Sequence, residues 1–503
     1  MSSRTYKDAI ERLNSLQSNA ATLEAVRASG GRLSEFAIPE MVEYLGRIGY
    51  STSDLNRLNV IHITGTKGKG STSAFTDSIL RHAMPQWKIG LYTSPHLVAV
   101  RERIRINGTP ISEEEFARFF FDVWDRLEEN TTRAHPQTSF MPAYFRFVTL
   151  VAYHAFLSLK VDATILEVGV GGAYDSTNIV PRPIVAGVSA LGIDHTAVLG
   201  KTLKEIAWQK GGIYKEGVPA LTVDQPDEGM EVLRQQAADK KASEFIVIPP
   251  TPGISNIKLG LAGNHQYQNA NLAVHLTRTF LRVQAGKELG AELPELFIQG
   301  LQNTKWPGRC QTVADPKHDK LTWFLDGAHT KESLDCCMQW FVSADTALRP
   351  IDSSVHRDRM LVFNCTNGRS GKALLDISLA RIGAQLKLHG RDDDAGSFFD
   401  HVVFCTNVTY SDGGFKGDLT THAIPTDDLA HLQTQHDLAN AWSSLLPTFP
   451  ADHIHVLPSI EHSITLVHAL QKQNEGGVDV LVSGSLHLVG GVIEVAGLSE
   501  VAL

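Results

Sequence analysis

The chain has 503 residues, of which 43% are hydrophobic and 20% charged, and its formal net charge at pH 7 is -9. This composition is sufficient for two or three domains with sizeable cores, and it excludes wholesale disorder. The acidic balance argues against a dedicated nucleic-acid-binding protein, because such proteins usually carry a basic surface. Five cysteines without a CxxC pair indicate reduced thiols and no zinc knuckle.

The start of the chain contains no apolar leader, and Asp8 and Glu11 disfavour a mitochondrial presequence. We therefore expect a cytoplasmic protein, with a mitochondrial form only if an additional N-terminal presequence is present. The apolar stretch Phe147–Leu159 is too short to span a membrane and predicts a buried helix. Neither a membrane nor a nucleic acid is expected as a partner.

Apolar, β-branched runs alternate with helical patterns along the chain, which is typical of βαβ units and a mostly parallel sheet. In the first half of the chain we predict strands at Asn59–Thr64, Lys88–Tyr92, Ala163–Val168, Ile184–Ser189 and Pro219–Val223. A second series is predicted at Thr322–Leu325, Met360–Asn364, His401–Thr406, His453–Leu457 and Val478–Ser483. Pro307 and Gly308 lie between the two series, so the predicted domains are residues 1–304 and 305–503.

The strongest local motif is TGTKGKGST at Thr64–Thr72, which follows a predicted strand and begins a predicted helix over Ser71–Ala83. Its three glycines let the backbone curl so that several N–H groups point inward, and Lys69 adds a full positive charge. This combination predicts a phosphate cradle at a helix N-terminus. The motif departs from the strict G-x-x-x-x-G-K-[ST] pattern because Gly70 follows the lysine, so a metal-binding hydroxyl must come from elsewhere.

The loop resembles that of the Mur ligase superfamily, and matching stretches along nearly the whole chain resemble the folylpolyglutamate synthases of eukaryotic type. These stretches are TYKDAIERLNSLQSNA, HITGTKGKGSTSAF, YTSPHLVAVRERIRING, LEVGVGGAYDSTN, GIDHTAVLG, GNHQYQNANLAV, WPGR, DGAH and SGSLHLVGG. The resemblance implies an α/β fold with a Mur-ligase-like P-loop ATPase domain on a mostly parallel sheet, and a smaller C-terminal Rossmann-like α/β domain. It also implies ATP-dependent addition of L-glutamate to the γ-carboxylate of (poly)glutamyl tetrahydrofolate through an acyl phosphate.

The resemblance further implies the ligands ATP, Mg²⁺, reduced folates and L-glutamate, with a monovalent cation such as K⁺ as an additional candidate. The implied ATP-binding residues are Gly65, Thr66, Lys67, Gly68, Lys69, Gly70, Ser71, Gln266, Asn269, Arg309, Asp326 and His329. The implied metal ligands are Ser94, Glu167 and His195. The implied catalytic residues are Lys69, His195, Lys210 and His329. The implied contacts with folate or glutamate are His96, Arg103 and Arg369.

Elementary chemistry agrees with much of this assignment. A carboxylate and a triphosphate repel each other, so cations, backbone dipoles and Mg²⁺ must offset that repulsion. Glu167 ends a predicted strand, which places it at the edge of an open sheet where ligands bind, and Ser94 can supply the missing hydroxyl. The imidazole of His195 is an unusual ligand for magnesium.

Several residues keep two interpretations. Lys210 is either carbamylated, as its place in the motif implies, or an ordinary lysine paired near phosphate. Gln266 and Asn269 either bind adenine or cap a helix. In an extended segment Arg101, Arg103 and Arg105 would share one face, which is either solvated or borders the folate.

Two other functions remain open at this point. A dihydrofolate synthase would use the same chemistry with dihydropteroate as acceptor, and the nucleotide motifs do not separate it from the first function. A nucleotide-binding regulator without ligase activity is the third possibility, although such a protein would not need the combined lysine, serine, glutamate and histidine set. A monomer is expected.

Overall fold

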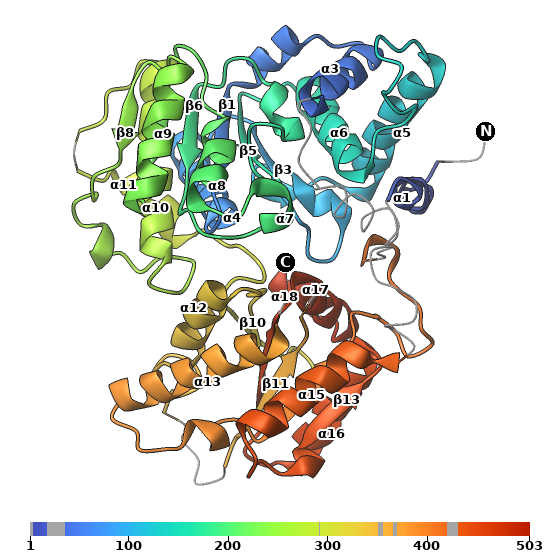
Figure 1. Cartoon of the computed structure of the whole chain (residues 1–503), viewed down its shortest axis with the longest axis vertical. Helices are drawn as coiled ribbons and strands as arrows, with labels where there is room; N and C mark the ends of the chain where they lie inside the picture. Colours follow the sequence, from blue (N-terminus) through green and yellow to red (C-terminus); the bar gives the residue numbers. More distant parts are fainter. Residues whose placement is uncertain (1–3, 18–35, 291, 351–355, 366–369, 420–430) are drawn as a thin grey trace.

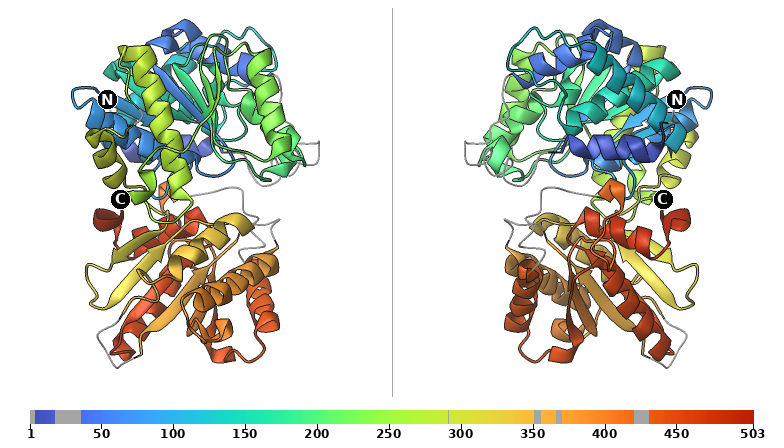
Figure 2. Two further views of the ribbon diagram at one scale, coloured as in Figure 1. Left: turned by 90° about the vertical axis from the view of Figure 1, so that its left-hand side faces the viewer. Right: turned by 90° about the vertical axis from the view of Figure 1, so that its right-hand side faces the viewer.

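The computed structural model describes residues 4–17, 36–290, 292–350, 356–365, 370–419 and 431–503. They form two bodies, each built on its own sheet, and the views in Figures 1 and 2 show these bodies stacked along the long axis of the molecule. The N-terminal body comprises the elements from α1 to α11, and the C-terminal body comprises those from β9 to α18. None of the helices in the described ranges is both long and apolar enough to cross a membrane.

The N-terminal body contains an eight-stranded sheet with the order β4-β3-β2-β5-β1-β6-β7-β8. Its strands are β1 Val60–Thr64, β2 Ile89–Tyr92, β3 Ile104–Ile106, β4 Thr109–Pro110, β5 Ala163–Glu167, β6 Val185–Val188, β7 Ala220–Thr222 and β8 Phe245–Val247. In the sheet order, neighbouring strands are parallel from β2 to β8, and β3 pairs antiparallel with both β2 and β4. The central strands are buried along their whole length, because helices cover both faces.

Helices pack on both faces of this sheet. One core joins β1, β2 and β5 to α1 Tyr6–Ser15, α3 Ala37–Arg47, α5 Glu113–Glu129 and α6 Tyr144–Leu159. A second core joins the opposite face to α4 Lys69–Ala83, α10 Gln266–Ala285 and α11 Glu295–Gln302. The remaining helical segments are η1 Thr52–Leu58, η2 Val100–Arg103, η3 Ser176–Ile179, α7 Thr196–Leu199, α8 Leu203–Gly211, α9 Asp227–Asp239 and η4 Ile254–Asn256. The predicted buried helix over 147–159 is confirmed within α6.

The C-terminal body contains a six-stranded sheet with the order β13-β12-β11-β14-β10-β9, in which only β9 is antiparallel. Its strands are β9 Gln311–Ala314, β10 Leu321–Leu325, β11 Asp358–Phe363, β12 His401–Cys405, β13 Ile454–Leu457 and β14 Val478–Ser483. One core holds α12 Lys331–Phe341, α13 Gly371–Leu388 and α15 Gln433–Leu445. The other holds α16 Ile460–Gln473, α17 Leu486–Val495 and α18 Ser499–Ala502. The short segments are η5 Ala395–Ser397, η6 Gly417–Leu419 and η7 Ala451–His453.

The α/β fold class and all ten predicted strands are confirmed, with differences of a few residues at their ends. The register of the first sheet then decides where the motifs lie. Ile63 pairs with Glu167, and Thr64 pairs with Val188 on the other side of β1. Because these strands are parallel, the loops that follow β1, β2, β5 and β6 meet at one edge of the sheet.

One local prediction is wrong. Arg101, Arg103 and Arg105 do not share the face of an extended segment, because Val100–Arg103 form a 3-10 turn that leads into β3. The reason is Glu102, whose buried carboxylate accepts the backbone N–H groups of three consecutive residues, 97 to 99, at 3.0, 2.9 and 2.6 Å. Satisfying these three donors closes the chain into a turn before the strand begins.

Candidate active site

The loop between β1 and α4 takes a shape that only glycine allows at two positions. Gly68 is the N-cap of α4 with φ +85°, in the left-handed region, and a β-carbon there would lie 2.0 Å from Oδ1 of Asn269. Gly65 has φ +153°, and a β-carbon on it would lie 1.9 Å from Oγ of Ser189. The glycines therefore permit close contact between the loop and its neighbours as well as the turn itself.

The residues that follow β6 fix the loop through hydrogen bonds. The backbone N–H groups of Thr66 and Lys67 both donate to the carbonyl of Ala190, at 2.9 and 3.1 Å. The Ser189 hydroxyl donates to the carbonyl of Lys67 at 2.7 Å. Two of the amides expected to face a phosphate are thus used within the protein. The first N–H groups of α4 have no partner within an α-helix, and they remain the donors for an anion.

Three lysines lie in or beside the loop. Lys67 forms an ion pair with Asp194 at 3.1 Å, and the Lys210 Nζ donates to the carbonyl of Gly65 at 2.7 Å. Burial, followed by the charge of Lys69, holds the pKa of Lys210 well below its ordinary value. Burial also lowers the pKa of Lys69, and the carboxylate of Glu167 opposes that shift. Lys67 and Lys69 are partly exposed at the loop, and positive side chains in this position favour a polyanionic ligand.

Glu167 and Ser94 lie together beside the N-terminus of α4. The buried Glu167 carboxylate, at the end of β5, accepts the backbone N–H of Ser94 at 3.1 Å. Burial raises the pKa of Glu167 to about 7, against the opposing charge of Lys69. A carboxylate and a hydroxyl at this place are hard oxygen donors, so the residues present fit a magnesium ion. His195 is an exposed N-cap of α7, next to the Asp194 that pairs with Lys67.

The two amide side chains at the start of α10 lie against the loop. Gln266 and Asn269 are both buried, and the Asn269 Nδ2 donates to Oε1 of Gln266 at 2.9 Å. Asn269 is also the residue that a side chain at Gly68 would strike. The pair therefore connects the beginning of α10 to the phosphate loop, and neither side chain caps α10.

The C-terminal body contributes a turn at the end of β10. Asp326 is buried, and its two carboxylate oxygens accept the backbone N–H groups of Cys310 at 2.7 Å and Ala328 at 2.8 Å. The His329 Nδ1–H donates to the carbonyl of Gly327 at 2.8 Å, which leaves Nε2 as an acceptor. Asp326 thus shapes the turn that carries His329. Arg309 lies beside this turn, because a β-carbon on Gly327 would lie 2.8 Å from its Nη1.

A pocket lies where the two bodies meet. Its lining comes from the strand ends of the N-terminal body, the chain between the bodies, and the start of α17. The lining residues are Thr93, Pro95, His96, Leu97, Glu102, Arg105, Trp306, Pro307, Arg309 and Leu486. The Arg105 guanidinium lies over the Trp306 ring, 5.2 Å from its centroid. Arg103 is buried directly behind this lining and donates from Nε to Nδ1 of His96 at 3.0 Å. Arg369, predicted to hold glutamate, lies outside the described residues.

The sequence analysis missed several residues that build this site. Ser189 and Asp194 hold the loop and one of its lysines, and Glu102 forms the turn beneath the pocket. Asp194 is part of the GIDH motif and could have been singled out, but a carboxylate is not expected beside a phosphate. Ser189 gives no signal, since it is one buried serine among many.

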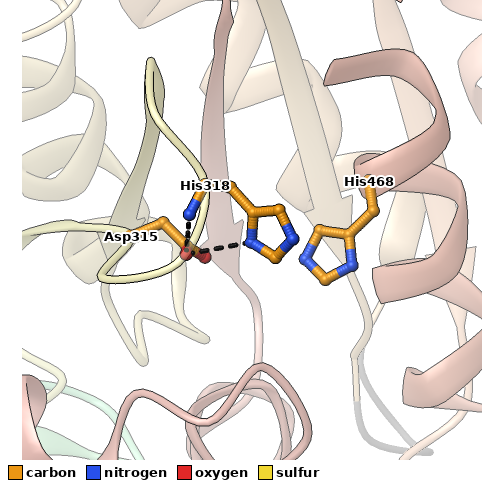
Figure 3. Close-up of side chains that lie close together, drawn as sticks. All are labelled: Asp315, His318 and His468. Atoms are coloured by element: carbon orange, nitrogen blue, oxygen red, sulfur yellow. Dashed lines mark hydrogen bonds and ion pairs between the residues drawn. The ribbon is translucent and has the colours of Figure 1, made fainter. Parts of the chain in front are cut away.

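Two other groups of side chains in the described part of the chain have the composition of a metal site, and both lie at the amino edge of the second sheet. Figure 3 shows the first, in which the rings of His318 and His468 lie nearly parallel, with centroids 4.1 Å apart and an interplanar angle of 27°. A metal-bound imidazole directs its in-plane lone pair at the ion, and stacked rings do not point at one ion. Asp315 also accepts hydrogen bonds from His318 and Trp323, so this group packs the β9–β10 turn against α16. The second group, His356, Asp358 and Asp400, includes an exposed histidine.

Comparison with known proteins identifies the family. A scan against models of protein families finds no match. A curated folylpolyglutamate synthase of Saccharomyces cerevisiae (strain YJM789) is 44% identical over 507 residues, which covers 98% of this chain and 87% of that protein. A folylpolyglutamate synthase of Mycobacterium tuberculosis complexed with ADP has a TM-score of 0.69 at 22% identity, covering 95% of this chain and 98% of that one. E. coli FolC in complex with DHPP and ADP has a TM-score of 0.63 at 21% identity, covering 96% and 99%.

The solved structures are too distant in sequence to establish more than the fold, and they agree with the two-sheet α/β architecture described above. The curated relative is much more similar in sequence, and the match covers 87% of its length. The glycine-rich loop between β1 and α4, the lysines beside it and the buried Glu167 lie together at the sheet edge, and with 44% identity to the curated relative the chain belongs to the folylpolyglutamate synthase family.

Proposed function

We propose that this protein catalyses the ATP-dependent addition of L-glutamate to the γ-carboxylate of a (poly)glutamyl tetrahydrofolate, with release of ADP and phosphate. In the first step an oxygen of the folate carboxylate attacks the γ-phosphorus of ATP, which forms an acyl phosphate and expels ADP. The amine of glutamate then attacks the acyl carbon, the bond to the phosphate oxygen breaks, and the amine proton is lost. The observation that carries this proposal is the position of Lys69 and Glu167 at a glycine-lined helix N-terminus. This N-terminus adjoins the pocket between the bodies, because a β-carbon on Gly70 would lie 3.0 Å from Nε1 of Trp306 in the pocket lining.

The nucleotide would lie along the loop from Gly65 to Ser71. In this arrangement the N–H groups at the start of α4 receive the phosphates, and Lys69 stabilises charge on the γ-phosphate. Gln266 and Asn269 would contact adenine, since they adjoin the loop at Gly68. From the C-terminal body, Arg309 and His329 would reach the phosphates, and Asp326 would hold the turn that presents His329.

Magnesium would be held by Glu167 and Ser94, and a second ion by His195, with K⁺ as a further candidate cation. When bound, Mg²⁺ supplies charge neutralisation between the β- and γ-phosphates. The residues themselves support the first site because Glu167 is a buried carboxylate adjacent to Ser94. His195 is exposed beside Asp194, an arrangement that leaves its ring accessible to a ligand.

Lys210 is proposed to be carbamylated. Formation of a carbamate requires a neutral amine, and burial shifts Lys210 toward that form. The carbamate would place an anion beside Lys67 and Lys69, where it can orient metal ligands. Intact mass measurement of protein prepared with and without bicarbonate tests this, and an unmodified mass under saturating bicarbonate excludes it.

The acceptor would lie in the pocket lined by His96, with the buried Arg103 behind it, while Arg369 is proposed to hold the incoming glutamate. The proposed division of labour assigns ATP, metal and folate binding to residues 1–304 and closure over glutamate to residues 305–503. Closure would exclude water from the acyl phosphate. A cytoplasmic monomer is the proposed working form.

The test is incubation of the protein with ATP, Mg²⁺, L-glutamate and tetrahydrofolate monoglutamate, followed by mass analysis of the folate. The expected result is a ladder of products that differ by one glutamyl residue, with one ADP released per step. A parallel incubation with dihydropteroate separates this function from that of a dihydrofolate synthase. Turnover with dihydropteroate alone, or ADP release that does not depend on glutamate, contradicts the proposal.

A further inference from the structure

A segment of the C-terminal body reaches across to the N-terminal body. After β12 the chain runs through residues 406–419, and Figure 1 shows this stretch rising beside α1. Its base is fixed to the C-terminal body, because the Ser411 N–H donates to the Glu461 carboxylate at 2.7 Å and Lys416 pairs with Glu494 at 2.6 Å. Its far end is the short η6 turn.

The η6 turn is attached to the N-terminal body through Asp418. One carboxylate oxygen, Oδ1, accepts both the Tyr6 hydroxyl at 2.7 Å and the Val100 N–H at 2.8 Å. The carbonyl of the preceding Gly417 accepts the Asn14 side-chain amide at 2.9 Å. Tyr6 and Asn14 are both in α1, whereas Val100 begins η2, so Asp418 joins three elements that are far apart in sequence.

The backbone of Asp418 also determines the state of a residue in the pocket lining. Its carbonyl lies 2.9 Å from Nε2 of His96, and a carbonyl can only accept, so Nε2 carries the hydrogen. Nδ1 of His96 is then an acceptor, as required by the Nε–H of Arg103, which donates to it at 3.0 Å. Because Nδ1 accepts and only Nε2 donates, these two hydrogen bonds require the neutral ring. A single tautomer and one ring orientation satisfy both hydrogen bonds.

Arg103 places a charge in the interior of the protein. It is buried, its guanidinium lies 5.5 Å from the centroid of the Tyr144 ring, and among the described residues no carboxylate lies within 4.0 Å of it. Burying an arginine without an anion is costly, and a substrate carboxylate would offset that cost. The direction of the Arg103 side chain is set by His96, and that of His96 by Asp418.

We propose that Asp418 is a positioning residue of the C-terminal body, which fixes His96 and Arg103 for binding of the acceptor's carboxylate. This inference rests on the proposed function, because it takes the acceptor to be an anionic folate in the pocket that His96 lines. It adds that the acceptor site of the N-terminal body is complete only when the 406–419 segment is attached. Binding of the acceptor and the relative position of the two bodies are therefore coupled through one carboxylate.

The test compares Asp418→Ala, Asp418→Asn and the control Asp412→Ala by steady-state kinetics of the full-length protein. Asp412 is exposed on the same segment, and its carboxylate accepts the N–H of Gly414 within that segment. Asp418→Ala is expected to raise KM for the folate about tenfold and to change KM for ATP less than twofold, whereas the control changes neither. Asp418→Asn keeps an oxygen that can accept from Tyr6 and Val100, so it is expected to recover most of the loss.

Amide hydrogen exchange provides a readout that does not depend on activity. The Val100 N–H donates to the Asp418 carboxylate, so its exchange should accelerate at least tenfold in Asp418→Ala and stay unchanged in Asp412→Ala. If the unmodified protein has no glutamate-dependent turnover, the proposed function fails while this exchange still tests the attachment. Equal changes in both KM values, no rescue by asparagine, or unchanged Val100 exchange would overturn the positioning role.

Discussion

Replacing Gly68 by alanine tests the shape of the phosphate loop. Gly68 has φ +85°, where an alanine costs about 1–2 kcal/mol relative to glycine. The new methyl carbon would also lie 2.0 Å from Oδ1 of Asn269, a buried side chain bonded to Gln266 at 2.9 Å. Displacing Asn269 forfeits that hydrogen bond, worth about 1 kcal/mol. The free loop of the variant relaxes out of this shape, and restoring the shape on binding costs the sum of the two effects, about 2–3 kcal/mol, or roughly 30- to 150-fold in Kd.

Calorimetric titration with ATP or a non-hydrolysable analogue measures this loss directly. The matched control is Gly217→Ala, because Gly217 also has a left-handed φ of +73° but a β-carbon there would have nothing within 4 Å. The control should lose stability by a similar strain and bind nucleotide normally. In an Asn269→Ala background the effect of Gly68→Ala should shrink, since the struck side chain is gone. Wild-type affinity in Gly68→Ala, or full additivity in the double variant, would refute the reasoning.

Three further predictions concern the metal, the pocket floor and the acceptor. Burial raises the pKa of Glu167 to about 7, and Mg²⁺ binds the ionised carboxylate. The affinity for Mg²⁺, measured by titration of the nucleotide complex, should therefore be full above pH 7 and fall about tenfold per pH unit below it. An affinity that does not change from about pH 5.5 to 8 would contradict this prediction. Glu102→Ala leaves three backbone N–H groups without their acceptor, and it should lower the free energy of unfolding of the N-terminal body in urea by roughly 2–4 kcal/mol. Glu102→Gln should stay closer to wild type. Equal unfolding free energies for Glu102→Ala and the wild type would exclude this role. Arg103→Ala should raise KM for long-tailed folates more than for the monoglutamate, and equal increases would count against a contact with the anionic tail.

The sequence predicted all the central strands and one edge strand, β13, and missed four strands toward the sheet edges. Nine of the ten predicted strands lie inside their sheets, and β1, β5 and β14 among them are apolar runs buried along their whole length. The tenth, β13, is an edge strand with partly exposed residues. The four that were missed, β3, β4, β8 and β9, lie toward the edges of their sheets. They have 2 to 4 residues each and include partly exposed positions, so no apolar run distinguishes them from a loop.

The residues of the candidate site also fall into those that could be predicted from the sequence and those that could not. The placement of the Gly65–Ser71 loop and Glu167 at one sheet edge could be predicted because each follows a predicted parallel strand, whereas Lys210 was singled out only through the family resemblance. Asp418 could not be predicted, because its partner Val100 is 318 residues away and the contact exists only once both bodies are folded. Neither a spacing nor a local composition marks such a residue.

The central claim is that the loop from Gly65 to Ser71 holds a triphosphate with its terminal phosphorus toward the acceptor carboxylate. The most direct test is glutamate-dependent ADP release by Lys69→Ala, with folding verified by its urea unfolding curve. The account predicts a fall in turnover of about a hundredfold or more, because Lys69 provides the full charge at the N-terminus of α4. Turnover at the wild-type rate in the folded variant would contradict it.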